Sequence, residues 1–233
     1  MKKMMLVAMM LDVALSCFAN SEYKESIVTP VSLGLTYSLR YPASNDVTVY
    51  GLRAGVWMND MDLDMHHSAR ANNINVYGVS IGLLTMIDHE VTGFQISGWG
   101  NTVDTLRGLQ TSFFLNKSMG SIYGCQISMG GNTIIDGKRR STKGNLYGIQ
   151  ASLLCNWCEE DTNGIQMALL NVGSDVSGVQ AGLVNGARDV KGMQIGLLNM
   201  ARDLKGVQIG LLNLKEARSA CVFSICPILR VGW

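Results

Sequence analysis

The chain has 233 residues, a formal net charge of +1 and only 16% charged residues, with 26 glycines against three prolines. The near-zero charge excludes the strong field that attracts nucleic acid, so no nucleic-acid partner is expected. An apolar, glycine-rich and charge-poor composition of this length indicates one ordinary domain or one repeat array, built from many short strands.

The N-terminus has the features of a secretory signal peptide. Lys2 and Lys3 form a positive region, residues 4–15 are largely apolar, and Ala19 follows a segment that offers small residues for cleavage. We therefore expect residues 1–19 to be removed and residues 20–233 to form a single repeat-built β domain. The alternative is a lipoprotein signal in which Cys17 carries the lipid anchor. Both alternatives predict an exported protein.

An internal repeat covers nearly all of the remaining chain and predicts its fold class. Four copies of the motif Gly-x-Gln-x-x-Leu-x-Asn follow one another with a period of 14 residues near the C-terminus. Diverged copies begin at Gly148, Gly124, Gly108, Gly93 and Gly78, and fainter ones at Gly51 and Gly34. The residues that define the four clear copies are Gly164, Gln166, Asn171, Gly178, Gln180, Asn185, Gly192, Gln194, Asn199, Gly206, Gln208 and Asn213.

Each copy has the two-residue period of a β-strand with one apolar face. In the last copy Val207, Ile209 and Leu211 alternate with glycine and Gln208. About ten strand residues and a turn of about four residues, such as 200–203, account for the period. Four upstream copies carry one extra residue before their asparagine, which predicts a β-bulge in those strands.

Two longer segments interrupt the repeat, at about 59–75 and 134–145. The first predicts a solvated loop, with a weaker alternative as a metal site, because alternate aspartates suit a hard cation and histidines suit a transition metal. The residues of that weak candidate are Asp60, Asp62, Asp64, His66 and His67. The second segment is basic, and we expect it to be solvated or to touch anionic headgroups. Its basic residues are Lys138, Arg139, Arg140 and Lys143.

The cysteines and histidines give little support to catalysis. Cys155 and Cys158 form a C-x-x-C, but residues three apart on a strand face opposite sides, so an incidental or structural pair is favoured over a local disulfide or a redox site. His89 has acidic neighbours at an expected turn, yet no nucleophile elbow or phosphate-binding loop accompanies it. We expect no enzyme activity and no cofactor.

The C-terminal segment alternates apolar residues and ends in an aromatic side chain. Leu229, Val231 and Trp233 share one face of this predicted strand. The pattern resembles the recognition signal at the end of outer-membrane barrel proteins.

The glycine- and glutamine-containing copies, the predicted hairpin at 41–50 and the ending at 227–233 together resemble the leptospiral-type surface repeat-containing protein family. The resemblance covers most of residues 30–233, and the terminal tryptophan stands where phenylalanine is expected. It implies an exported protein of bacteria with two membranes, and it implies no particular activity.

Two all-β architectures accommodate these strands. The favoured one is an antiparallel up-and-down β-barrel of about twelve strands in an outer membrane, with Ile209 facing lipid and Gln208 facing the interior. The alternative is a β-solenoid with Ile209 in a dry core and Gln208 in an outward amide ladder. The expected function is that of an outer-membrane or cell-surface structural or interaction protein in contact with membrane lipid. A periplasmic or surface-attached binding module is the alternative, and no ligand or protein partner can be named.

Overall fold

The computed structural model describes residues 26–36, 40–42, 44, 46–58, 73–135, 144–216 and 223–232. Every regular element in these ranges is a strand. The strands are β1 (Ile27–Thr36), β2 (Arg40–Tyr41), β3 (Asp46–Met58), β4 (Asn73–Ser97), β5 (Gly100–Ser112), β6 (Leu115–Ser118), β7 (Ile122–Ser128), β8 (Gly131–Ile134), β9 (Leu146–Ser152), β10 (Cys155–Cys158), β11 (Thr162–Met167), β12 (Leu170–Ala181), β13 (Val184–Ile195), β14 (Leu198–Glu216) and β15 (Phe223–Gly232).

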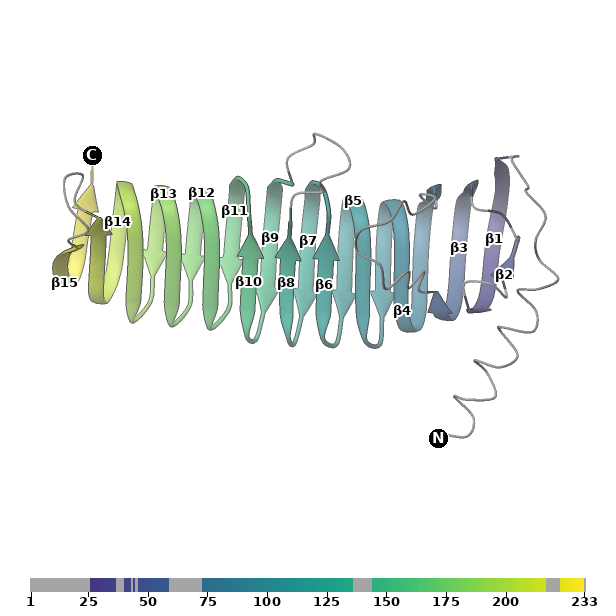
Figure 1. The fold of residues 1–233 in the computed structure, drawn as a ribbon, viewed down its shortest axis with the longest axis horizontal. Coiled ribbons are helices and arrows are strands. Elements are labelled where there is room, and N and C mark those ends of the chain that lie inside the picture. Colours follow the sequence, from purple (N-terminus) through teal and green to yellow (C-terminus); the bar gives the residue numbers. More distant parts are fainter. Residues whose placement is uncertain are drawn as a thin grey trace, which may run out of the picture.

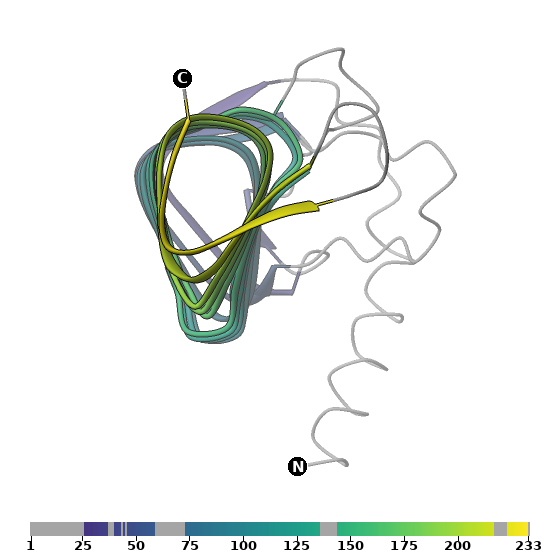
Figure 2. The same ribbon diagram turned by 90° about the vertical axis from the view of Figure 1, so that its left-hand side faces the viewer.

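Successive repeats lie on top of one another in parallel register along the long axis of the molecule (Figure 1). Gly164 pairs with Gly178, Gly178 with Gly192 and Gly192 with Gly206, so each residue lies beside its own counterpart in the next repeat. Viewed along the axis, the coils nearly superpose (Figure 2). Eight strands close a hydrogen-bonded ring in the order β5, β6, β8, β10, β12, β11, β9 and β7, and the other strands lie outside it.

Both expected architectures are wrong. The repeats pair in parallel, and among the described strands only β1–β2 and β14–β15 pair antiparallel, so the chain is no up-and-down barrel. The solenoid alternative placed Ile209 inside and Gln208 outside, whereas Ile209 is 40% exposed and Gln208 is fully buried. Eight strands moreover close into a ring. The two-residue alternation was read correctly, but alternation by itself does not say which face is inside.

The predicted turn is also misplaced. Residues 200–203 lie within β14, and the chain bends instead at Gly196 and Leu197, between β13 and β14. The amides of Leu197 and Leu198 both donate to the carbonyl of Leu183 one coil earlier, at 2.9 Å. Because hydrogen bonds between coils satisfy the bend, it does not need polar side chains. The extra residue of the upstream copies is likewise accommodated at this bend, beside Leu153, and forms no bulge within a strand.

Two ladders of buried amides run through the interior. From Gln110 onward, each Gln Nε2 donates to the Oε1 of the preceding repeat at 2.7–2.9 Å. The residues of this column are Gln95, Gln110, Gln126, Gln150, Gln166, Gln180, Gln194 and Gln208. Each Asn Nδ2 donates the opposite way, to the Oδ1 of the following repeat, at 2.8–3.0 Å. This second column is Asn101, Asn116, Asn132, Asn156, Asn171, Asn185, Asn199 and Asn213. Paired amides of this kind can be buried without the penalty of unmet hydrogen bonds.

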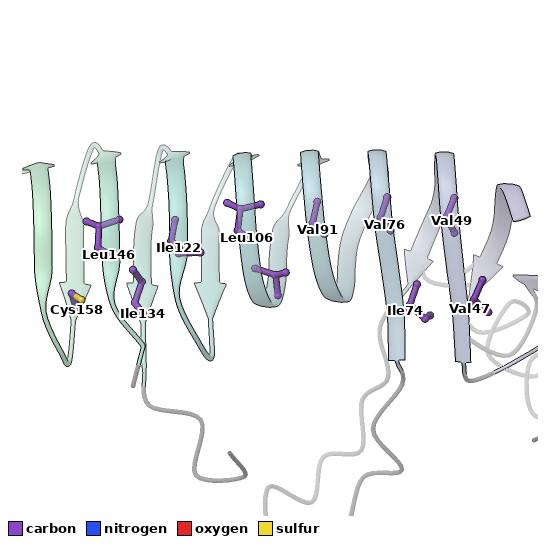
Figure 3. Packing of buried hydrophobic residues seen from close by; sticks show 11 residues of the cluster. Val47, Val49, Ile74, Val76, Val91, Leu106, Ile122, Ile134, Leu146 and Cys158 are labelled. Atoms are coloured by element: carbon purple, nitrogen blue, oxygen red, sulfur yellow. The ribbon is translucent and has the colours of Figure 1, made fainter. Parts of the chain in front are cut away.

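A narrower apolar core completes the interior. Leu106, Ile122 and Leu146 stack in register and are fully buried, and Val47, Val49, Ile74 and Val76 continue the cluster toward β1 (Figure 3). A second, smaller apolar cluster lies in the C-terminal coils and consists of Val190, Ala201 and Leu204.

One column of glycines permits the close stacking. Gly178 has φ +149°, and a Cβ placed on it would overlap the carbonyl oxygen of Gly164 in the neighbouring coil. Neither the dihedral nor the distance is open to a residue with a side chain.

Replacing a glutamine in the middle of the ladder should lower the free energy of unfolding more than replacing the glutamine at its end. In Gln180→Met, Gln166 loses its donor and Gln194 loses its acceptor, so we expect a loss of about 2–4 kcal/mol in the free energy of unfolding. Gln208→Met is the matched control, because its Oε1 has no partner and only Gln194 is left unpaired. Its loss should be about 1–2 kcal/mol by urea denaturation. Equal losses for both variants would contradict the ladder.

The glycine column gives a second test. Gly178→Ala should lower the free energy of unfolding by about 2 kcal/mol or more, because it combines a strained dihedral with an overlap on backbone. At Gly186 the nearest atom to an added Cβ is the Met200 Cε at 3.9 Å, so Gly186→Ala should change stability by less than about 1 kcal/mol. Thermal and urea unfolding of the two variants, side by side, measure the difference.

Candidate interaction surface

The exposed surface of the coils is divided into a charge-free part and a charged part. Nine segments of the sequence run from a repeat glycine to the asparagine position, from 78–86 to 206–213, and none contains Asp, Glu, Lys or Arg. Each segment includes the bend between coils. The bends therefore carry large apolar side chains and no charge.

Fourteen side chains on these segments form what we call the apolar ridge. They are 39–67% exposed, and they follow one another from coil to coil along the molecule. The residues of the apolar ridge are Leu83, Leu84, Trp99, Phe113, Phe114, Met129, Leu153, Leu154, Leu169, Leu170, Leu183, Leu197, Leu211 and Leu212. At about 4.8 Å per coil, the ridge extends for about 40–45 Å. Apolar patches of this size on a protein surface mark sites of interaction.

The backbone beneath the ridge is hydrogen-bonded from one coil to the next. The amide of Leu169 donates to the carbonyl of Leu153, that of Leu183 to Leu169, and that of Leu197 to Leu183, at 2.9–3.2 Å. The same pattern continues upstream, where Phe114 donates to Trp99 at 3.0 Å. The ridge thus presents side-chain hydrocarbon over amides that are already paired.

Half a repeat away, the surface carries charges that are paired between coils, which we call the charged strip. Asp175, Asp189 and Asp203 stack in register, and like charges so placed repel. Arg188 lies between two of them, with its Nη2 2.7 Å from Asp175 Oδ1 and its Nε 3.5 Å from Asp189 Oδ2. The carboxylate of Asp175 raises the pKa of Arg188, first through the hydrogen bond and then through its charge. The Nε of Arg202 likewise lies 3.6 Å from the Oε2 of Glu216 in the next coil.

Length variation in the repeat also falls on the side of the charged strip. The segments 59–72 and 136–143 interrupt the chain after the asparagine position of one repeat and before the glycine of the next. The charge-free segments differ by only one residue in length. The repeat is therefore most uniform where it forms the apolar ridge.

A buried charged group lies at the N-terminal end of the glutamine ladder. Arg53 occupies the glutamine position of its repeat, and its guanidinium forms an ion pair with Asp88 inside the coil. Asp88 also accepts hydrogen bonds from Ser80 Oγ at 2.7 Å and from Gln95 Nε2 at 2.8 Å. Asp88 thereby receives the last donor of the ladder. This buried pair was not predicted from the sequence, although Arg53 stands at the glutamine position of an otherwise uncharged segment and could have indicated it.

His89 and its acidic sequence neighbours Asp88 and Glu90 do not come together in a common site. His89 lies within β4, where its Nδ1 is 2.8 Å from Asp104 Oδ2. Asp88 points inside, and Glu90 forms an ion pair with Arg107 on the surface. The expected turn is therefore wrong.

Several other sequence predictions lie wholly or partly outside the described residues. These include residues 1–19 with Cys17, the weak metal candidate Asp60 to His67, the basic segment 138–143 and Trp233. Within the described ranges no cluster of three His, Cys, Asp or Glu side chains is suited to a metal ion. Leu229 and Val231 lie exposed on β15, and so does Ile228 between the alternating positions.

The C-x-x-C pair divides between the two sides of β10. Cys155 is exposed and Cys158 is buried, and both are free thiols. The Cys158 thiol is 3.6–3.7 Å from the carbonyl oxygens of Gly144, Glu160 and Asp161. Burial raises its pKa, with the charge of Asp161 adding in the same direction. The expectation that residues three apart face opposite sides is confirmed.

Comparison of the chain with protein-family profiles, with curated proteins and with solved structures found no match. In the part of the chain that the structure describes, no helix has the length and apolar character needed to cross a membrane.

The two thiols should differ in reactivity. With iodoacetamide at about pH 8, Cys155 should be alkylated in the folded protein, whereas Cys158 should react only after denaturation, because burial and a raised pKa keep it as the thiol. Peptide mass spectrometry of native and urea-unfolded samples measures both. Modification of Cys158 at the rate of Cys155 would contradict this geometry.

Proposed function

We propose that this protein is an exported interaction protein of the bacterial cell envelope or surface, and that it binds its partner through the apolar ridge. The signal-like residues 1–19 and the resemblance to leptospiral-type surface repeat-containing proteins support export. The uninterrupted, charge-free and exposed ridge is the observation that carries the proposal. The proposal includes no catalytic step and no cofactor.

The energetics favour contact along the whole ridge rather than at one residue. Covering a half-exposed leucine contributes about 1 kcal/mol, because full burial contributes about 1.5–3 kcal/mol. Fourteen such side chains together contribute on the order of 10 kcal/mol. Association itself costs roughly 4–15 kcal/mol, so binding requires that most of the ridge be engaged.

A pair of aspartates on the ridge tests the proposal in cells. Leu183→Asp with Leu197→Asp places two charges on neighbouring coils, and we expect the protein to move from the envelope fraction to the soluble fraction. The reason is that about 2 kcal/mol of apolar contact is lost and two carboxylates resist desolvation.

Asn163→Asp with Ser177→Asp is the matched control. These exposed residues also pair on neighbouring coils, and they change the net charge by the same amount, but they lie on the charged strip. The control should fractionate as the natural chain does, and circular dichroism should show all three proteins folded. Equal envelope retention of the ridge variant and the natural chain would refute the proposed binding surface.

A further inference from the structure

We infer that the apolar ridge docks on the surface of a lipid bilayer, with the ridge side chains among the upper acyl-chain segments and the charged strip facing water. This inference rests on the proposed function and names the partner for the same surface. It describes a protein lying in the interface, the β-strand counterpart of an interfacial amphipathic helix.

The first argument is the charge distribution around each coil. In the last regular repeats, Leu183 and Leu197 project from the bends, whereas Asp189, Asp203 and the exposed Lys205 lie half a repeat away. This separation persists through nine consecutive charge-free segments, 78–86 to 206–213. At a planar interface between water and hydrocarbon, the apolar ridge can face the hydrocarbon and the charged strip can face the water along the whole length of the molecule.

The second argument is the state of the backbone. Unpaired amides and carbonyls cannot enter hydrocarbon without a large penalty. At the ridge, the amides of Trp99, Met129, Leu154 and Leu212 donate to the carbonyls of Leu84, Phe113, Gly130 and Leu197, at 2.8–3.1 Å. The ridge can therefore meet acyl chains with its backbone hydrogen bonds already formed.

The third argument is the chemistry of the ridge side chains. The ridge follows the bends of the chain, and its side chains are hydrocarbon apart from the Trp99 indole and the Met129 thioether. A specific protein partner is recognised by shape complementarity and about one hydrogen bond per 100–200 Å². The ridge side chains offer few such groups, whereas lipid requires none. Since the ridge carries no charge, anionic headgroups are not needed either.

The test uses the full-length protein and phosphatidylcholine vesicles. The natural chain should float with the vesicles, and a tenfold increase in sodium chloride should leave binding about unchanged, because no exposed charge is involved. Leu183→Asp with Leu197→Asp should weaken vesicle binding about tenfold or more, and Asn163→Asp with Ser177→Asp should change it by less than about twofold. Residues 4–15 are largely apolar and can bind vesicles by themselves, so the comparison of the two variants decides, rather than the binding of the natural chain alone.

A fluorescence experiment locates the contact. Trp99 is 55% exposed on the ridge, and replacing Trp57, Trp157 and Trp233 by phenylalanine leaves it as the sole tryptophan. Its emission should shift to shorter wavelength with vesicles and be quenched by lipids brominated on the acyl chains. The control changes all four tryptophans to phenylalanine and adds Tyr123→Trp on the side of the charged strip, where quenching should be absent.

Each remaining outcome separates the two proposals. Envelope retention that depends on the ridge, without vesicle binding or Trp99 quenching, overturns lipid docking and leaves the proposed function standing. Dimers that dissociate in the ridge variant, seen by analytical ultracentrifugation without vesicle binding, identify a second copy as the partner and also overturn lipid docking. If the ridge variant keeps full vesicle binding, lipid docking through this surface is wrong.

Discussion

The stacking of each residue on its own counterpart, about one strand spacing away, is the constraint on which the rest of this structure depends. A residue type can form a column only if it is compatible with itself at that distance. Glutamine and asparagine meet this requirement, since an amide is both donor and acceptor and bonds to an identical neighbour. Glycine meets it where backbones approach most closely, as at Gly178. Leucine meets it through apolar contact at the bends.

Charge is incompatible with such a column inside the molecule. Where acidic residues stack, as at Asp175, Asp189 and Asp203, they do so on the surface with arginines placed between coils. The buried pair of Arg53 and Asp88 occurs where the repeat changes and the glutamine column begins. The two amide ladders donate in opposite directions, so their aligned dipoles oppose one another. The donor end of the glutamine ladder meets the Asp88 carboxylate, which is the favourable sign.

The sequence predicted the strands, the repeat and the sidedness of each strand, because all three follow from local periodicity. The solenoid alternative also expected a ladder of stacked glutamines, but on the outside of the coil. The favoured barrel had the wrong direction of strand pairing, since parallel and antiparallel strands share the same alternation. The solenoid alternative assigned the wrong face of the strand to the interior, because it assumed that Ile209 is more buried than Gln208.

The bend and the candidate surface were missed for a related reason. Turn rules expect polar residues, and the sequence offered a polar stretch at 200–203, whereas the chain bends at Gly196 and Leu197. In an isolated hairpin the backbone amides of such a bend would have to bond to water. Here they donate to carbonyl oxygens of the preceding coil. The absence of charged residues at equivalent positions of successive repeats indicates the ridge, whereas the polarity of a single strand does not.

The same stacking that builds the molecule raises the question of why it stops. A coil end that exposes parallel strand edges and open amide ladders would accept a coil of another molecule. β15 prevents this at the C-terminal end, because it pairs antiparallel with β14 and places Arg230 opposite Gln208, so no amide continues the ladder. Gln208 Oε1 is accordingly left without a partner. At the other end β1 pairs in parallel with β3, and the described part of its antiparallel pairing with β2 joins Leu33 to Tyr41 and Gly34 to Arg40. The apolar ridge runs along the side of the coils, away from both ends, and this is the surface that we propose for an extended partner.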